Sequence, residues 1–106
     1  MIDTIKNICV VLPTYNESEN IHNTLEEIFL NKKALKDFKL SVLVVDDNSP
    51  DNTSGLVKDL IKDNSELYLI NGEKKGLGDA YKRGINYALN NLEADLIIQI
   101  DADGQH

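Results

Sequence analysis

Apolar and polar positions fall into long alternating blocks along the chain, and these blocks predict its secondary structure. Four short runs are apolar, largely β-branched and of strand length: residues 7–12, 40–45, 66–70 and 95–100. In the three segments between them, apolar residues return every three or four positions, which is the spacing of an amphipathic helix. The chain therefore predicts the order β-α-β-α-β-α-β.

Each predicted helix has an apolar stripe, which identifies the face turned toward the sheet. The first helix begins at Ser18, and the second begins near Ser49, where Ser49, Pro50 and Asp51 all favour a helix start. The expected core positions, in helix order, are Ile21, Leu25, Ile28 and Phe29, then Leu56, Leu60 and Ile61, then Ala80, Tyr81, Ile85, Ala88 and Leu89.

The alternation of strands and helices predicts an α/β fold with a parallel open sheet, helices on both faces and right-handed crossovers. Residues 42–45 are apolar without alternation, which is typical of a strand covered on both faces. In open sheets of this kind, ligands bind outside the carboxyl ends of the strands. Polar segments follow three of the predicted strands, at 13–17, 46–51 and 101–106, so we expect them to face one crevice.

Composition indicates one small globular unit. With 42% hydrophobic and 27% charged residues, 106 residues can bury a single modest core. The net charge of -7 disfavours nucleic acid as a partner, and a local cluster of acidic residues suggests a divalent cation instead. Cys9 is the only cysteine, which fits a reducing, cytoplasmic compartment. No apolar run is long enough to span a membrane.

Asp101 and Asp103, at the end of the last predicted strand, are candidate metal ligands. In an extended chain residues i and i+2 point the same way, so both carboxylates can reach one point while Ala102 turns back toward the protein. Carboxylates this close repel, so either one is protonated or a cation lies between them. Mg²⁺ or Mn²⁺ suits such an oxygen site, which the amide oxygen of Gln105 could join. The alternative is that Asp103 and Gly104 form an ordinary turn.

Two better-known motifs for ions and phosphates do not fit. An EF-hand loop needs glycine at its sixth position, whereas Gly104 falls at the fourth and no helix precedes it. The segment around Lys74 and Lys75 lacks the Gly-Lys-Ser/Thr of a P-loop, and Tyr81 replaces the last glycine of a dinucleotide motif. What remains is a helix start preceded by lysines and glycines. This segment either brings Lys75 to an anionic substrate or forms only a tight turn.

Two further polar segments could hold a ligand. Asp46 and Asp47 follow the second strand and, as neighbours, point to opposite faces, which disfavours chelation of one ion by both. One of them would accept hydrogen bonds from a ligand while the other holds a neighbouring loop, or both would only cap the turn. In the first segment Pro13 ends the strand, Tyr15 offers a ring on which a base could stack, and Glu17 lies at the helix start, where a carboxylate is favoured in any case.

Four motifs, in this order, resemble the start of family 2 glycosyltransferases, most nearly the dolichol-phosphate mannose synthases and their polyprenyl-phosphate relatives. The motifs are VVLPTYNESENI, VVDDNSPDNT, KKGLGDAYKRGINYA and DLIIQIDADGQH. The resemblance covers essentially the whole chain and implies a GT-A fold. The positions that hold the nucleotide in this family match Pro13, Tyr15, Glu17, Val45 and Asp47. Asp101, Ala102 and Asp103 match the D-x-D segment that meets the diphosphate and metal, and Gln105 matches a position that can complete the metal shell.

The resemblance also implies a reaction. The donor would be GDP-mannose or a UDP-sugar, and the acceptor a polyprenyl phosphate whose own oxygen attacks the anomeric carbon with inversion. Asp101 and Asp103 would then assist departure of the diphosphate through the metal, without acting as nucleophile or base.

On the same grounds, residues 1–106 are expected to form the nucleotide-sugar-binding half of a glycosyltransferase, without the acceptor half. Such a chain would bind a donor without turnover. Copies of it could associate through an open sheet edge. The full-length enzyme would act at the cytoplasmic face of a membrane.

Two other classes share some of these features. A receiver-like regulatory module also clusters acids with Mg²⁺ at strand ends, but it needs an acidic pair after its first strand, where this chain reads PTYN. A nucleotidyltransferase would share the nucleotide-binding architecture but needs a glycine-rich, basic loop at that position. Both stay open as alternatives at this point.

Overall fold

The computed structural model describes residues 6–15, 19–32, 38–46, 51–72 and 77–100, in seven elements. In chain order these are β1 (Asn7–Thr14), α1 (Ile21–Lys32), β2 (Lys39–Asp46), α2 (Thr53–Ile61), β3 (Leu67–Asn71), α3 (Leu77–Asn91) and β4 (Leu96–Gln99). The predicted order of strands and helices is confirmed.

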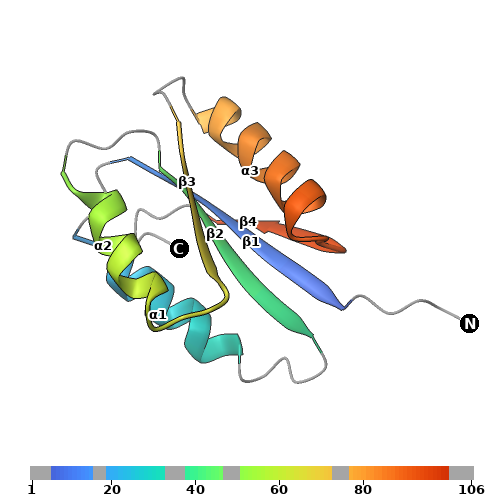
Figure 1. Cartoon of the computed structure of the whole chain (residues 1–106), viewed down its shortest axis with the longest axis horizontal. Helices are drawn as coiled ribbons and strands as arrows, with labels where there is room; N and C mark the ends of the chain where they lie inside the picture. Colours follow the sequence, from blue (N-terminus) through green and yellow to red (C-terminus); the bar gives the residue numbers. More distant parts are fainter. Residues whose placement is uncertain (1–5, 16–18, 33–37, 47–50, 73–76, 101–106) are drawn as a thin grey trace, which may run out of the picture.

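The four strands form one parallel sheet in the order β3-β2-β1-β4. Helices α1 and α2 lie on one side of the sheet and α3 lies on the other (Figure 1). The chain thus builds outward from β1 to β3 and then returns through α3 to the opposite side of β1. The predicted fold class, an α/β fold with an open parallel sheet, is therefore confirmed, and the point where the strand order reverses lies between β1 and β4.

Two apolar cores form because β1 and β2 are covered on both faces. In β2, Val42 and Val44 face the core under α1 and α2, whereas Leu43 and Val45 face the core under α3. This explains why the segment has no polar alternation. Cys9 belongs to the core under α3, and burial raises the pKa of its thiol.

Strand β1 is longer than predicted, because it continues through Pro13 to Thr14 and does not end at the proline. Residue Pro13 pairs in register with Val45 of β2. The backbone of Val11, two residues earlier, faces β4, since its carbonyl accepts a hydrogen bond from Ile100 N at 3.2 Å. The missing N–H of Pro13 points the same way, so no bond to β2 is lost and the ladder between β1 and β2 continues.

The apolar faces of α2 and α3 also differ from the prediction. Helix α2 begins at Thr53, later than expected, and its fully buried side chains are Thr53 and Val57, whereas Leu56 is exposed. In α3 the sheet-facing row is Ala80, Gly84 and Ala88, spaced four residues apart. The next residue, Leu89, lies outside this row and is 52% exposed.

The last strand is less buried than its apolar sequence predicts. Leu96 and Ile98 of β4 are 41% and 39% exposed. They pair with Ile8 and Val10, so they share the sheet face of α1 and α2. Within the described ranges, β4 pairs with β1 alone and no helix covers these two side chains.

The amino end of the sheet is held by the carboxylate of Asp95. Its Oδ2 atom accepts hydrogen bonds from Lys6 N at 3.0 Å and Asn7 N at 2.9 Å. In return, Asp95 N donates to Asn7 O at 2.8 Å, and this exchange fixes the start of β1 beside the start of β4. The hydrogen bond from the backbone N–H of Asn7, and to a lesser degree the one from Lys6, holds the pKa of Asp95 below its ordinary value of 3.8.

Replacing Asp95 is expected to make stability less dependent on pH. A carboxylate with a lowered pKa in the folded state stabilises the fold above its unfolded pKa, and this contribution disappears as pH falls through the folded pKa. Urea unfolding of the parent chain and of Asp95→Asn should therefore differ near neutral pH and converge in acid, below the ordinary value of 3.8. A difference that stays constant across this range would contradict the assignment.

Candidate functional site

The carboxyl ends of all four strands lie along one edge of the sheet, because the strands are parallel. Along this edge, β1 leads to Tyr15, β2 ends at Asp46, β3 ends at Asn71, and β4 is followed by Ile100. The predicted polar segments therefore start from neighbouring strand ends, as the sequence indicated.

Three of the predicted site residues lie within the described structure, and they are Pro13, Tyr15 and Val45. The others lie outside the described residues: Glu17, Asp47, Lys75, Asp101, Ala102, Asp103 and Gln105. Within the described ranges, no three His, Cys, Asp or Glu side chains gather closely enough to hold a metal ion. The metal site at Asp101 and Asp103 stays a prediction.

The three described site residues differ in their access to a ligand. Pro13 and Val45 are buried and pair with each other across β1 and β2. Tyr15 follows the end of β1 and is only half-buried. Of the three, Tyr15 has the ring most open to an approaching base.

A buried carboxylate, Asp46, organises this edge and is only 1% exposed. Thr14 Oγ1 at the end of β1 donates to Asp46 Oδ1 at 2.7 Å. Ser54 Oγ in the first turn of α2 donates to Asp46 Oδ2 at 3.0 Å. On the main chain, Gly72 N, just after β3, donates to Asp46 O at 3.0 Å. One residue thus joins three strand ends and a helix start.

The network extends to Asn71. Ser54 Oγ lies 2.6 Å from Asn71 Oδ1 as well as near Asp46. A hydroxyl carries one proton, so Ser54 shares it between the two oxygens. The sequence left open whether Asp46 has a structural or a ligand-binding role, and in the structure it holds neighbouring elements, chiefly through hydroxyl groups. Thr14, Ser54 and Asn71 were not singled out, because their contacts join residues 8 to 32 positions apart.

The start of α2 at the same edge depends on local polar contacts. Asp51 Oδ1 accepts a hydrogen bond from Thr53 N at 3.2 Å, and Asn52 O accepts one from Leu56 N at 3.1 Å. Asn52 has a left-handed backbone with φ of 68°. The side chain of Asn52 occupies the space that a Cβ at position 55 would need, so a larger residue there would displace this exposed side chain. Ser49 and Pro50, where the helix was expected to begin, lie outside the described residues.

Helix α3 approaches the sheet closely at Gly84. A Cβ at this position would lie 2.5 Å from Val11 Cγ1 and 3.0 Å from Val45 Cγ2, both closer than carbon atoms pack. The glycine therefore sets the separation between α3 and the two central strands. Val45, a predicted nucleotide-binding position, has its side chain enclosed by this contact.

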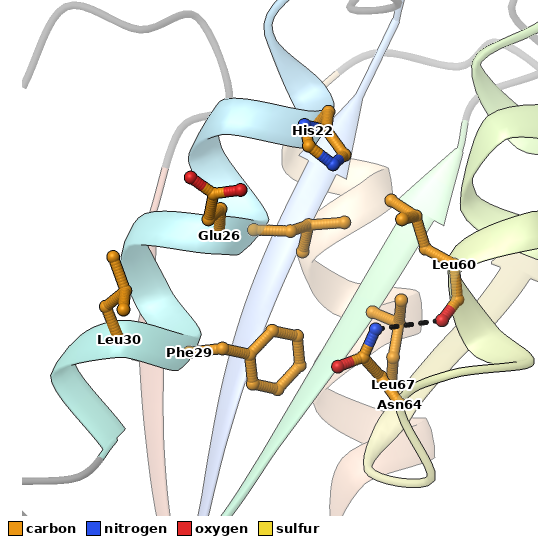
Figure 2. A pocket seen from close by; sticks show the side chains of 8 residues that line it. His22, Glu26, Phe29, Leu30, Leu60, Asn64 and Leu67 are labelled. Carbon is orange, nitrogen blue, oxygen red and sulfur yellow. Dashed lines mark hydrogen bonds between the residues drawn. The ribbon is translucent and has the colours of Figure 1, made fainter.

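A separate groove of about 310 Å³ opens between α1 and α2. Phe29 points from α1 across it toward Leu67 and Asn64 (Figure 2). Asn64 Nδ2 donates to Leu60 O at 2.9 Å and so faces the backbone of α2. His22 lies on the rim and is exposed. This groove lies on a helical face of the molecule and shares none of its lining with the strand ends described above.

Comparison with known proteins identifies the family. A model of glycosyl transferase family 2 matches residues 9–106. The chain belongs to this family. The match includes all four sequence motifs and the whole of the described sheet except its first residues.

Curated relatives include poly-beta-1,6-N-acetyl-D-glucosamine synthase of Staphylococcus aureus, which is 32% identical over 105 residues. That alignment covers 95% of this chain and 24% of the synthase. An uncharacterised protein of Methanocaldococcus jannaschii is 36% identical over 98 residues, covering 91% of this chain and 40% of that protein. The chain thus spans between a quarter and two fifths of the length of these relatives.

Solved structures agree with the fold. The mannosyltransferase PcManGT from Pyrobaculum calidifontis, in complex with GDP-Man and Mn²⁺, superposes with a TM-score of 0.72 at 28% identity, covering 91% of this chain and 27% of that one. Mannosyl-3-phosphoglycerate synthase from Rubrobacter xylanophilus gives the same TM-score of 0.72 and identity of 28%, over 96% of this chain and 32% of that one. TarS of S. aureus in complex with UDP superposes with a TM-score of 0.63 at 25% identity, covering 92% of this chain and 27% of that one. The glycosyltransferase resemblance and the GT-A fold are both confirmed.

None of the described helices has the length and apolar character needed to cross a membrane.

Adding one methyl group at Gly84 is expected to destabilise the fold. Gly84→Ala should lower the free energy of unfolding by up to about 2 kcal/mol, because overpacking costs about 1–3 kcal/mol and is set against a helix-propensity gain of about 1 kcal/mol. The matched control is Gly78→Ala in the same helix, where a Cβ would meet nothing within 4 Å. That variant should gain about 0.5 kcal/mol. Urea unfolding of both variants tests the contact, and equal effects would contradict it.

Proposed function

We propose that this chain is the nucleotide-sugar-binding part of an inverting glycosyltransferase that uses a nucleoside diphosphate sugar, GDP-mannose or a UDP-sugar, as donor. The observation that carries the proposal is the family match over residues 9–106, together with a sheet that brings the strand ends of the matched motifs to one edge. Binding of GDP-Man by PcManGT and of UDP by TarS supports the donor class and leaves the choice of nucleotide to experiment.

The nucleotide would lie across the ends of β1 and β2. Tyr15 is half-buried there and presents an aromatic ring, on which a base can stack. Pro13 and Val45, which are buried and paired at the carboxyl end of the sheet, would form the floor beneath it. Glu17 and Asp47 would add hydrogen-bond acceptors for the base and ribose, and Lys75 would face the phosphates.

Asp101 and Asp103 would hold a divalent cation, Mg²⁺ or Mn²⁺, with Gln105 completing the oxygen ligands and Ala102 between them lining the diphosphate. Two observations on this chain fit such an ion. The donor set is entirely oxygen, and Ile100 N bonds to Val11 O, so the chain is still held beside β1 at the residue before Asp101. A cation bound there would act as a Lewis acid toward the departing diphosphate. The two carboxylates would orient the leaving group and take no part in attack.

The structure and the family together disfavour the two alternative classes. A receiver-like module has the strand order 2-1-3-4-5, with β1 between β2 and β3. Here β1 lies between β2 and β4. A nucleotidyltransferase would share the donor nucleotide, but the family match and the named relatives are glycosyltransferases and sugar-polymer or sugar-phosphoglycerate synthases.

For the acceptor we propose a polyprenyl phosphate, such as dolichyl phosphate, whose phosphate oxygen attacks the anomeric carbon. Support for this comes from the similarity of the four motifs to dolichol-phosphate mannose synthases. It would place the full-length enzyme at the cytoplasmic face of a membrane. On this proposal residues 1–106 bind the donor and the acceptor half lies elsewhere in the enzyme, so the chain by itself would not transfer sugar.

We also propose that copies of this chain associate through β4. The described part of β4 has one strand neighbour, and Leu96 and Ile98 leave an apolar edge exposed. Sedimentation velocity at increasing concentration should show a dimer for the parent chain and a monomer for Ile98→Lys. A monomer at every concentration for both would refute it.

Donor binding should depend on the metal and on Asp103. Titration of the chain with GDP and UDP, with and without Mn²⁺, is expected to show binding of one nucleotide that weakens at least about tenfold without metal, which is about 1.4 kcal/mol. Asp103→Ala should weaken binding by a similar factor in the presence of Mn²⁺, because one ligand to the cation is lost.

The control is Asp63→Ala, which removes an exposed carboxylate after the end of α2, away from the strand ends. It should bind the nucleotide as the parent chain does. Nucleotide binding that needs no metal and is unchanged in Asp103→Ala would refute the metal assignment.

A further inference from the structure

We infer that Asp46 is a positioning residue for donor binding, and that it acts through the hydroxyl of Thr14 to hold the end of β1 against the end of β2. This inference rests on the proposed function, because the segments that Asp46 holds are those proposed to bind the nucleotide. It assigns to Asp46 and Thr14 a role in affinity without direct contact with the ligand.

The hydrogen bonds of Asp46 join several segments, and we call this set of bonds, to Thr14, Ser54 and Gly72, the clamp. Each of its side-chain oxygens accepts a hydrogen bond from a different element, Oδ1 from Thr14 at 2.7 Å and Oδ2 from Ser54 at 3.0 Å. Its carbonyl oxygen accepts a third bond, from Gly72 N. The ends of β1 and β3 and the first turn of α2 are therefore all fixed relative to one residue of β2.

The burial of Asp46 determines what its hydrogen bonds contribute. Asp46 is 1% exposed and Thr14 is 3% exposed, so their hydrogen bond is shielded from water. A buried carboxylate without partners is strongly destabilising, and an apolar pair of the same volume would stabilise a sheet at least as well. Unlike an apolar pair, the Asp46 carboxylate accepts directional hydrogen bonds. These bonds fix the positions of the strand ends relative to one another.

The location of the clamp links it to the ligand. Thr14 immediately precedes Tyr15, and Asp46 immediately precedes Asp47. Side chains of adjacent residues in a strand point to opposite faces. The clamp therefore occupies the face turned toward α1 and α2 and leaves the neighbouring positions for the nucleotide. A shift of one strand end relative to the other would move Tyr15.

The test separates the Thr14 hydroxyl from the Thr14 methyl group. Thr14→Val keeps the shape and removes the hydroxyl, whereas Thr14→Ser keeps the hydroxyl and removes the methyl group. Affinity for the nucleotide is measured with Mn²⁺ at a temperature where circular dichroism shows each variant to be folded. Thr14→Val should bind at least about tenfold more weakly, the loss expected for a hydrogen bond to a charged group, and Thr14→Ser should stay within about threefold of the parent chain.

A matched control distinguishes positioning from general loss of stability. Leu40→Val removes one methylene from a buried residue near the amino end of β2, far along the strand from Asp46. It should lower the unfolding midpoint and leave nucleotide affinity unchanged. If Thr14→Val binds as tightly as the parent chain, or if Leu40→Val weakens binding equally, the positioning role is refuted.

Amide hydrogen exchange gives a second readout that does not need a nucleotide. Gly72 N–H bonds to Asp46, so loss of the Thr14 hydroxyl should speed its exchange at least about tenfold, while Thr14→Ser should not. A parent chain that binds neither GDP nor UDP would refute the proposed function. In that case unchanged exchange at Gly72 in Thr14→Val would independently refute the clamp.

Discussion

Burial of both faces of β1 and β2 is the constraint under which the rest of the molecule is arranged. A parallel strand can return to the sheet only through a crossover, and the three crossovers here place two helices on one face and one on the other. Both central strands are then closed to water from either side. Apart from Ser41 in β2, the polar side chains of these two strands lie at the strand ends. The shared direction of all four strands brings their carboxyl ends to one edge.

At that edge the buried core meets the segments that carry the family motifs. Asp46 is buried deeply enough to belong to the core, yet its bonds are directed at the segments that carry the family motifs. At the opposite end of the sheet Asp95 performs a simpler task, in which an exposed carboxylate ties the first residues of β1 to the start of β4. The two carboxylates hold opposite ends of β1 in different ways. Asp46 accepts hydrogen bonds from side-chain hydroxyls, of which that of Thr14 is buried, and Asp95 accepts them from exposed backbone amides.

Much of this architecture could be predicted from the sequence, because hydrophobic periodicity is a local property. The runs around Val10 and Val44 and the helical spacing of Ile21 and Leu25 were sufficient for the element order and the parallel sheet. The predictions were wrong where the buried face of a helix or the exposure of a strand depends on residues distant in the sequence. Leu89 fits a helical stripe, but the approach of Gly84 to the sheet turns a different row inward. The apolar run of β4 matches a buried strand, and its exposure depends on which neighbours surround it.

The site was predicted less completely, for a related reason. Position at a strand end identified the segments around Tyr15 and Asp101, whereas the bond from Thr14 to Asp46 joins two strands and has no local pattern. Asp46 was recognised as polar and well placed, and only its partners show what it does. A threonine before an aromatic residue and a serine in a helix's first turn are common, so neither was distinctive by itself.

The absence of a side chain at position 84 has a consequence for how sequences of this fold can vary. Val11, Val45 and Gly84 meet in one small volume between helix and sheet, and a side chain at position 84 would have no room beside the two valines. A larger residue in the helix would need a smaller partner in one of the two strands. Substitutions at positions 11, 45 and 84 should therefore be coupled, so that the total number of side-chain carbon atoms at the three positions stays nearly constant.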